Sequence, residues 1–139
     1  FSVYGDSESE MRLIPTLLRE AKKGKFPNLG SKEISRDFVH VDDVIEVIKL
    51  GIESINFVKG SIFNICSGKK ITLLQLCEIV KYHFKIKRNP IFDTRPNHSW
   101  DIKDWYGNSQ KAQKILGWEP KMSLKDYFQE EFKKAFNVK

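Results

Sequence analysis

The chain has 139 residues, of which 40% are hydrophobic, so it is long enough to bury one modest core and too apolar to be disordered. Its 24 lysines and arginines outnumber its 18 acidic residues and give a net charge of +6, but they are scattered among the acids without a long basic run. This pattern argues against a nucleic-acid-binding protein, which concentrates its positive charge, and favours affinity for a small anion.

Hydropathy and cysteine content bear on membrane association, metal binding and cellular compartment. No apolar stretch approaches the roughly 20 residues needed to cross a membrane, so no membrane association is expected. Cys66 and Cys77 lack the spacing of metal ligands and are best explained as buried thiols in a reducing compartment. We therefore expect a cytoplasmic protein without a metal site.

The chain opens with a strand followed by a helix. Residues 1–4 read as a strand already under way. Leucines at helical spacing then predict a helix over residues 11–23. Because Pro15 fits only in the first turn of a helix, that helix should begin near Ile14. A short extended piece follows over residues 25–29.

The rest of the chain is organised around residues 35–44, where strand formers turn abruptly into a helical pattern. Asp42 stands where a helix N-cap belongs, since its carboxylate can accept from the unpaired N–H groups of the first turn. His40 alternates with valines and is interpreted as a hydrogen-bonding strand residue, not a catalyst. The helix that follows should reach Ser54 and bury four apolar side chains: Val44, Val47, Ile48 and Ile52.

The second half repeats the alternation of strand and helix. Residues 61–66 form a compact apolar run between glycines, which predicts a strand covered on both faces. Three helices are predicted behind capping residues: one from Thr72 to about Phe84, one from Ser109 to Ile115, and a last one behind Ser123. A short strand at residues 105–106 and a packing anchor at Trp118 complete the pattern. No repeat or linker is visible, so residues 1–139 are expected to form one α/β unit.

Arg36 is the first candidate for a binding role. It stands near the start of the central strand, where a guanidinium is a planar fork for a phosphate or a carboxylate. The spacing equally allows Arg36 to pair locally with Asp37 or Asp42. The residues by themselves leave both readings open.

Residues 36–43 resemble the Arg-Asp-aromatic-x-His-Val-x-Asp signature of the nucleotide-sugar branch of the extended short-chain dehydrogenases/reductases. These are NAD(P)-dependent epimerases and dehydratases that act on sugars attached to nucleoside diphosphates. Further segments match the family in its own order, at residues 3–5, 12–15, 63–68, 105–112 and 116–120. Each match is weak by itself, whereas the whole set in register covers nearly the entire chain.

The resemblance implies the C-terminal part of a Rossmann-like doubly wound sheet together with a small α+β substrate-binding domain. It also implies a nucleoside-diphosphate sugar as ligand and NAD or NADP as cofactor of the full-length enzyme. A homodimer is expected because the strand at residues 1–4 would leave an open edge that recruits another chain. The sequences of residues 1–5 and of the loop after Arg95 resemble more those of relatives that remodel deoxysugars for surface polysaccharides.

Two motifs of the family are missing from this chain. No Gly-x-x-Gly-x-x-Gly turn follows a strand, and none of the four tyrosines has a lysine four residues later. We therefore expect the chain to be a piece of a longer enzyme that carries no catalytic or cofactor-binding residue and is inactive alone. The alternative is a stand-alone module that binds a nucleoside diphosphate without chemistry.

The resemblance also assigns the substrate-holding residues. The two arginines that contact the diphosphate in the family fall on Arg36 and Arg95, although Arg95 could instead bind carbonyls of its own loop. Ser2 replaces an asparagine that touches the substrate in relatives, and it keeps a donor and an acceptor with a shorter reach. The candidates for walling the nucleobase are Leu18, Lys25, Phe26 and Pro27. Phe26 could stack on the base or belong to the core, and His98 could approach the phosphate or the sugar.

Overall fold

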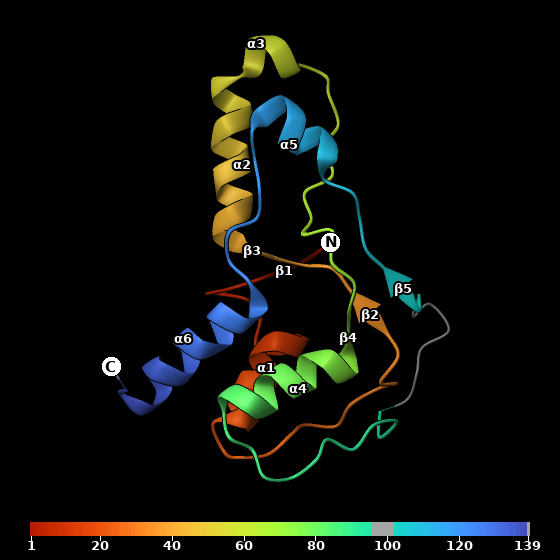
Figure 1. Cartoon of the computed structure of the whole chain (residues 1–139), viewed down its shortest axis with the longest axis vertical. Coiled ribbons are helices and arrows are strands. Elements are labelled where there is room, and N and C mark those ends of the chain that lie inside the picture. The colour runs from red at the N-terminus through yellow and green to blue at the C-terminus, as the bar shows by residue number, and fades with distance from the viewer. Residues whose placement is uncertain (96–101, 139) are drawn as a thin grey trace.

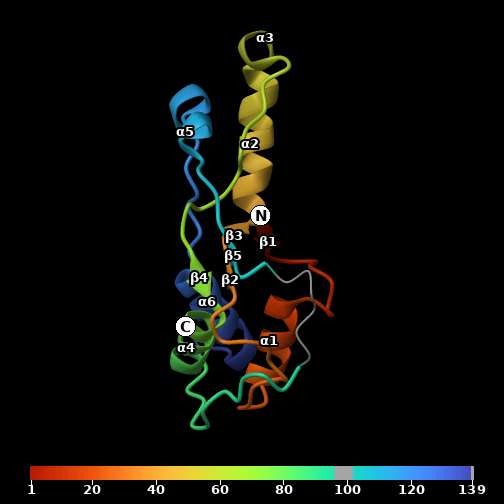
Figure 2. The same cartoon turned by 90° about the vertical axis from the view of Figure 1, so that its right-hand side faces the viewer.

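The computed structural model describes residues 1–95 and 102–138. The helices gather at the two ends of an elongated molecule, and the short strands lie between them (Figure 1). One end holds α2 (Val41–Glu53), α3 (Ile55–Val58) and α5 (Gln110–Leu116). The other end holds α1 (Leu13–Ala21), α4 (Leu73–His83) and α6 (Leu124–Phe136). Figure 2 shows that α1 lies on one side of this end, whereas α4 and α6 lie on the other.

The strands form two small sheets. β1 (Ser2–Tyr4) pairs in parallel with β3 (Phe38–His40). β2 (Ser35–Arg36) is the centre of a three-stranded sheet, antiparallel to β4 (Ile71–Thr72) and parallel to β5 (Asp104–Trp105). Helices combined with parallel and antiparallel strands confirm the α/β class. The short strand predicted at residues 105–106 is observed one residue earlier.

The N-cap predicted for α2 is wrong. His40 occupies that position, and its Nδ1 accepts the backbone N–H of Asp42 at 3.3 Å. The chain enters the helix at Val41, directly after β3, so Asp42 already lies in the first helical turn. There its carboxylate faces the positive end of the helix dipole together with that of Asp43. His40 therefore ends the strand and caps the helix at once.

The strand predicted over residues 61–66 is also wrong. The structure assigns no strand there, and this apolar run has no ladder partner among the described residues. The carbonyl of Ile62 instead accepts from Lys111 Nζ at 2.8 Å. The Ile62 side chain is 83% exposed, so it packs on neither face of a sheet.

Three other predicted helix-end signals are confirmed, whereas the side chain of Ser109 makes no capping bond to α5. Thr72 caps α4 through a reciprocal pair of bonds with Gln75, the capping box of a stable helix start. Ser123 caps α6 by accepting from the backbone of the first turn. Gly117 ends α5 with a φ of 65°, the left-handed conformation that glycine adopts without strain.

The buried side chains form two clusters where the sequence predicts one core. The larger cluster fills the space between α1, α4 and α6, with members such as Leu17, Val80 and Phe128. The smaller cluster joins α2, α5 and β3, and consists of Val39, Val47, Ala112 and Trp118. Trp118 is confirmed as a packing anchor, because its ring is almost completely buried.

Only part of the apolar face predicted for α2 is buried. Val47 lies in the smaller cluster and Val44 packs against it. Ile48 and Ile52 are 56% and 67% exposed, respectively, which contradicts the prediction that they face the core. The reason is geometric: α5 runs beside α2 and covers it from one direction (Figure 1).

Candidate functional site

Arg36 lies at the centre of the three-stranded sheet. Its Cα pairs with those of Ile71 on β4 and Trp105 on β5. Its Nη1 donates to two backbone carbonyls, those of Ser35 at 2.7 Å and Ile102 at 2.8 Å. These two bonds fold the partly buried guanidinium back over the start of β5 and fix its position beside the sheet.

Asp37 is the residue that sequence reasoning missed. Its carboxylate is fully buried and accepts four hydrogen bonds, from the backbone N–H and the hydroxyl of Ser67 and from the N–H groups of Gly68 and Gly107. It thereby ties three separate segments of the chain together directly beside Arg36. The available signal was an acid next to buried strand formers, because a buried carboxylate must find donors.

A second carboxylate is held at the edge of the same sheet. Asp104 Oδ1 accepts from Ser35 Oγ at 2.9 Å and lies 2.6 Å from Lys70 Nζ. The hydrogen bond from Lys70, followed by the one from Ser35, lowers the pKa of the Asp104 carboxyl. The strand that carries Arg36 is therefore bordered by a fixed negative charge and its lysine partner.

Ser2 lies on β1, next to the strand that follows Arg36. Its backbone N–H donates to the carbonyl of Asp37 at 2.8 Å, and its Cα pairs with that of Phe38. The Ser2 side chain is partly buried. The parallel pair of strands thus places Ser2 against the two residues that follow Arg36.

The four nucleobase candidates surround the end of α1. Leu18 is buried in the larger cluster, and Phe26 packs against that cluster while staying partly exposed. Pro27 is also partly buried, and Lys25 Nζ lies 3.3 Å from a carboxylate oxygen of Glu20. Leu18 therefore has a core role, whereas residues 25–27 keep surface that a ligand could contact.

Arg95 lies beside this second group. The carbonyl of Leu29 accepts from the N–H groups of Thr94 and Arg95 at 2.9 and 3.1 Å, and Thr94 Oγ1 accepts from the N–H of Leu29 at 2.9 Å. The two chain segments consequently run together below α1 (Figure 2). The Arg95 side chain is exposed. The candidates thus form two groups. The first consists of Ser2 and Arg36, and the second of Leu18, residues 25–27 and Arg95.

Residues 96–101 follow Arg95 in the sequence and lie outside the described residues. The candidate His98 is one of them. Within residues 1–95 and 102–138, no helix is long and apolar enough to cross a membrane. In the same part of the chain, no three side chains of the metal-binding types gather into a possible site.

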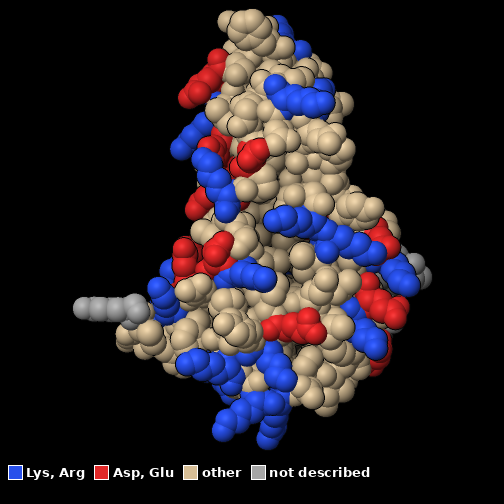
Figure 3. Space-filling view, viewed as in Figure 1, with Lys and Arg blue, Asp and Glu red and all other residues tan. Residues whose placement is uncertain are grey.

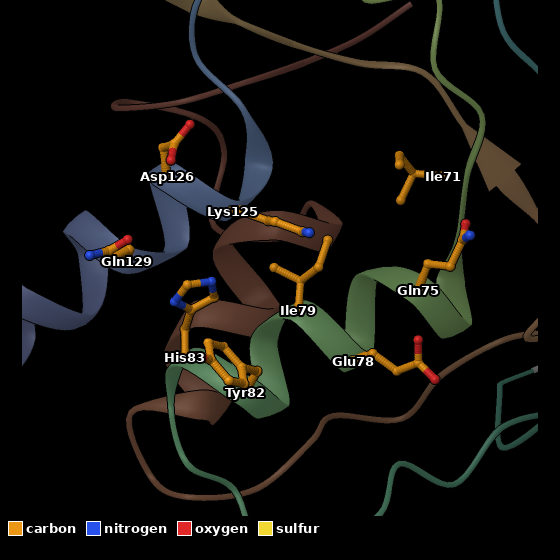
Figure 4. A pocket seen from close by; sticks show the side chains of 9 residues that line it. All are labelled: Ile71, Gln75, Glu78, Ile79, Tyr82, His83, Lys125, Asp126 and Gln129. Atoms are coloured by element: carbon orange, nitrogen blue, oxygen red, sulfur yellow. The ribbon is translucent and has the colours of Figure 1, made fainter.

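A separate groove runs between α4 and α6. It has a volume of about 730 Å³, and its lining includes Ile79, Tyr82 and Lys125 (Figure 4). None of the seven candidate residues lines it. On the face seen in Figure 3, lysines and arginines gather at the lower end, and elsewhere they lie among acidic side chains. The candidate site is therefore defined by Arg36 and its neighbours.

Comparison with known proteins identifies the family. The family model described as GDP-mannose 4,6 dehydratase matches residues 1–131. The UDP-glucose 4-epimerase of Halalkalibacterium halodurans is 34% identical over 134 residues, which cover 84% of this chain and 37% of that protein. The GDP-6-deoxy-D-talose 4-dehydrogenase of Aggregatibacter actinomycetemcomitans is 30% identical over 122 residues, which cover 84% of this chain and 40% of that protein.

Solved structures share the fold. The UDP-glucose 4-epimerase of Thermotoga maritima, solved with UDP-glucose, has a TM-score of 0.78 and 26% identity, over 98% of this chain and 43% of that one. The UDP-glucuronic acid 4-epimerase of Bacillus cereus has a TM-score of 0.79 at 20% identity, over 100% and 44% of the two chains. The chain spans about 40% of the length of such relatives. With residues 1–131 matched, it belongs to the family of GDP-mannose 4,6 dehydratase, within the extended short-chain dehydrogenases/reductases.

Proposed function

We propose that this chain is the substrate-binding part of an NAD(P)-dependent nucleotide-sugar epimerase or dehydratase. Its role is to hold the nucleoside diphosphate through Arg36 and Arg95. The main support is the family match over residues 1–131 combined with the anchored guanidinium of Arg36 on the central strand. The Thermotoga maritima epimerase was solved with UDP-glucose, a molecule of the same class.

The position of Arg36 suits an anion. A guanidinium has five N–H donors in a rigid fork, and the bonds from Nη1 to two carbonyls restrict how that fork can turn. Less rotational freedom is therefore lost when a diphosphate binds. Asp37 strengthens this arrangement, because it fixes the backbone next to Arg36 without offering its carboxylate to the surface.

The second group would hold the nucleobase and, through Arg95, reach the same diphosphate. Arg95 supplies an exposed cation, and the backbone bonds to Leu29 set it beside residues 25–27. Phe26 packs against the larger cluster and keeps part of its surface exposed for a base. Ser2, on β1, has a hydroxyl that can donate to or accept from the substrate.

The redox step requires residues that this sequence does not contain. NAD or NADP would accept and return a hydride in the full-length enzyme, but neither the glycine-rich turn nor the Tyr-x-x-x-Lys pair is present. The residues of this chain therefore contribute binding and orientation of the sugar nucleotide. We expect no turnover of a sugar nucleotide by the chain alone.

A homodimer in the cytoplasm completes the proposal. Two buried cysteines without a disulfide suit a reducing compartment. The outer side of β1 is a candidate interface, since β1 pairs only with β3 among the described strands.

Titration calorimetry of the 139-residue chain with UDP and GDP tests the proposed function. Arg36→Ala and Arg95→Ala should each weaken binding by about 1.5–3 kcal/mol, the usual loss for a hydrogen bond to a charged group. Arg36→Lys should recover only part of this, because lysine keeps the charge but lacks the fork. Arg88→Ala, an exposed arginine outside the site, is the control.

Equal binding by the wild type and both alanine variants would refute the assignment of the two arginines. Turnover of a nucleotide sugar by the chain alone would refute its restriction to binding. Circular dichroism on each variant excludes loss of fold as the cause of weaker binding.

A further inference from the structure

Trp105 lies on the same face of the three-stranded sheet as Arg36. In the parallel pair of β2 and β5, Arg36 is registered with Trp105 and Ser35 with Asp104. Registered residues point to the same face of a sheet and successive residues to opposite faces. The hydrogen bond from Ser35 Oγ to Asp104 Oδ1 agrees with this division, because it joins the two side chains of the other face.

The exposure of Trp105 is unusual for so large a ring. Its side chain is 47% exposed on an edge strand, whereas Trp118 is 1% exposed and donates its Nε1–H to the carbonyl of Asp43 at 2.8 Å. A tryptophan that packs in a core becomes buried and finds an acceptor, as Trp118 does. Trp105 leaves much of its ring available to another molecule.

The strand does not need the indole to stay in place. On the opposite face, Asp104 is bound by Ser35 and by Lys70. Along the backbone, the N–H of Ser35 donates to the carbonyl of Lys103 at 2.8 Å. Arg36 adds its own bond to the carbonyl of Ile102. These contacts anchor β5 from both sides, and within residues 1–95 and 102–138 none of them uses the indole.

An exposed aromatic face next to a guanidinium recognises a particular combination of groups. The cation attracts a phosphate, while the ring stacks on a planar base or on the apolar face of a sugar. Stacking of a nucleobase on an aromatic side chain is a strong and general contact. Trp105 and Arg36 together therefore fit a ring that is joined to a diphosphate.

We propose that Trp105 is a binding residue for the nucleotide sugar and stacks on a ring attached to the diphosphate that Arg36 holds. This inference rests on the proposed function and adds a contact that the sequence motifs do not assign. The ring belongs either to the nucleoside or to the hexose, and both present the flat apolar surface that the indole recognises.

The test compares three ligands of increasing size: inorganic pyrophosphate, UDP and UDP-glucose. Calorimetry on the 139-residue chain should show that Trp105→Ala leaves pyrophosphate binding unchanged and weakens UDP-glucose binding by about 5- to 100-fold. Trp105→Phe, which keeps a smaller ring, should lie between the two. If the indole stacks on the nucleoside, Trp105→Ala should weaken UDP binding as much as UDP-glucose binding. If it stacks on the hexose, UDP binding should not change.

Matched controls separate stacking from a structural effect. Tyr82→Ala removes another exposed aromatic ring, on α4, and should change none of the three affinities. Stacking should also quench the fluorescence of the wild type on addition of ligand, and this quenching should diminish in Trp105→Phe. A structural role for Trp105 would not produce a quenching that depends on the ring of the ligand.

The outcomes distinguish the two proposals. Wild-type chain that binds none of the three ligands refutes the proposed function. If the wild type and Trp105→Ala bind UDP-glucose equally tightly, the stacking role is refuted and the proposed function stays intact. Equal weakening of all three ligands in Trp105→Ala also refutes stacking, because pyrophosphate has no ring.

Discussion

Asp43 and Trp118 are 75 positions apart, yet the indole Nε1 of Trp118 donates to the carbonyl of Asp43 at 2.8 Å in the interior. The carboxylate of the same aspartate accepts the N–H groups of Lys121 and Met122 at 3.0 and 3.2 Å. One residue in the first turn of α2 thus fastens the segment that leads from α5 into α6.

Replacing Asp43 should destabilise the fold. Asp43→Ala leaves two partly buried N–H groups without acceptors, and each such group costs about 1–3 kcal/mol. We expect the free energy of unfolding in urea to fall by about 2–4 kcal/mol. The neighbouring Asp42→Ala is a matched control with an exposed carboxylate, and its effect should stay below about 1 kcal/mol. A similar loss in both variants would contradict the role of Asp43.

Asp37 should be still more sensitive. Asp37→Ala leaves three backbone N–H groups and the hydroxyl of Ser67 without their acceptor in a buried site. We therefore expect the free energy of unfolding to fall by at least about 3 kcal/mol. Ser67→Ala removes a single one of these donors and should cost about 1 kcal/mol. Hydrogen exchange at Gly68 and Gly107 should accelerate in Asp37→Ala. Unchanged exchange there would show that the carboxylate does not hold these loops.

Asp104 should contribute to stability in a pH-dependent way. Its carboxyl pKa is lowered below the ordinary 3.8 by Lys70 first and Ser35 second, so the folded state favours the charged form. The contribution is present above the unfolded pKa and is lost as the pH falls through the lower, folded pKa. Asp104→Asn should therefore flatten the acid limb of the stability curve below about pH 4. Identical curves for the two proteins would contradict this coupling.

Both cysteines should resist alkylation in the folded protein. Burial raises the pKa of the Cys77 thiol to about 12, and burial followed by the charge of Asp37 raises that of Cys66. Because the thiolate is the reactive form, iodoacetamide at pH 8 should modify both thiols much more slowly than a free cysteine. In denaturant both should react fully. Rapid modification of the native protein would show that the thiols are accessible.

β1 should mediate self-association. Its outer backbone groups have no ladder partner among the described strands, and Phe1 and Val3 are partly exposed beside them. We expect dimers or larger assemblies in light scattering. Val3→Pro, which cannot donate to a new ladder, should shift the protein towards the monomer. A monomeric wild type at high concentration would contradict the prediction.

Local chemistry made much of the fold predictable. The Thr72–Gln75 capping box, the Ser123 cap and the left-handed Gly117 depend on residues within a few positions of each other. Even near α5, where Ser109 was the expected cap, the acting side chain is the adjacent Asn108, whose Oδ1 accepts the N–H of Gln110 at 2.8 Å. Short-range signals therefore locate helix ends to within one or two residues.

The remaining differences come from partners far away in the sequence. Residues 61–66 have the composition of a strand, but a strand needs a ladder partner, and no described strand pairs with them. Ile48 belongs to an apolar helix face, but α5 approaches α2 from another side. At the candidate site, the motif identified Arg36, while Asp37 and Trp105 became apparent only through contacts across 30 or more positions and through strand register.

The two buried aspartates also determine when this fold can be completed on the ribosome. The donors to Asp37 include Gly107, and those to Asp43 lie at Lys121 and Met122, up to 79 positions later. A growing chain carries both carboxylates long before these donors have been synthesised, and it must keep them hydrated until then. The helices can form early, but the segments around the aspartates can close only once most of the chain has left the exit tunnel.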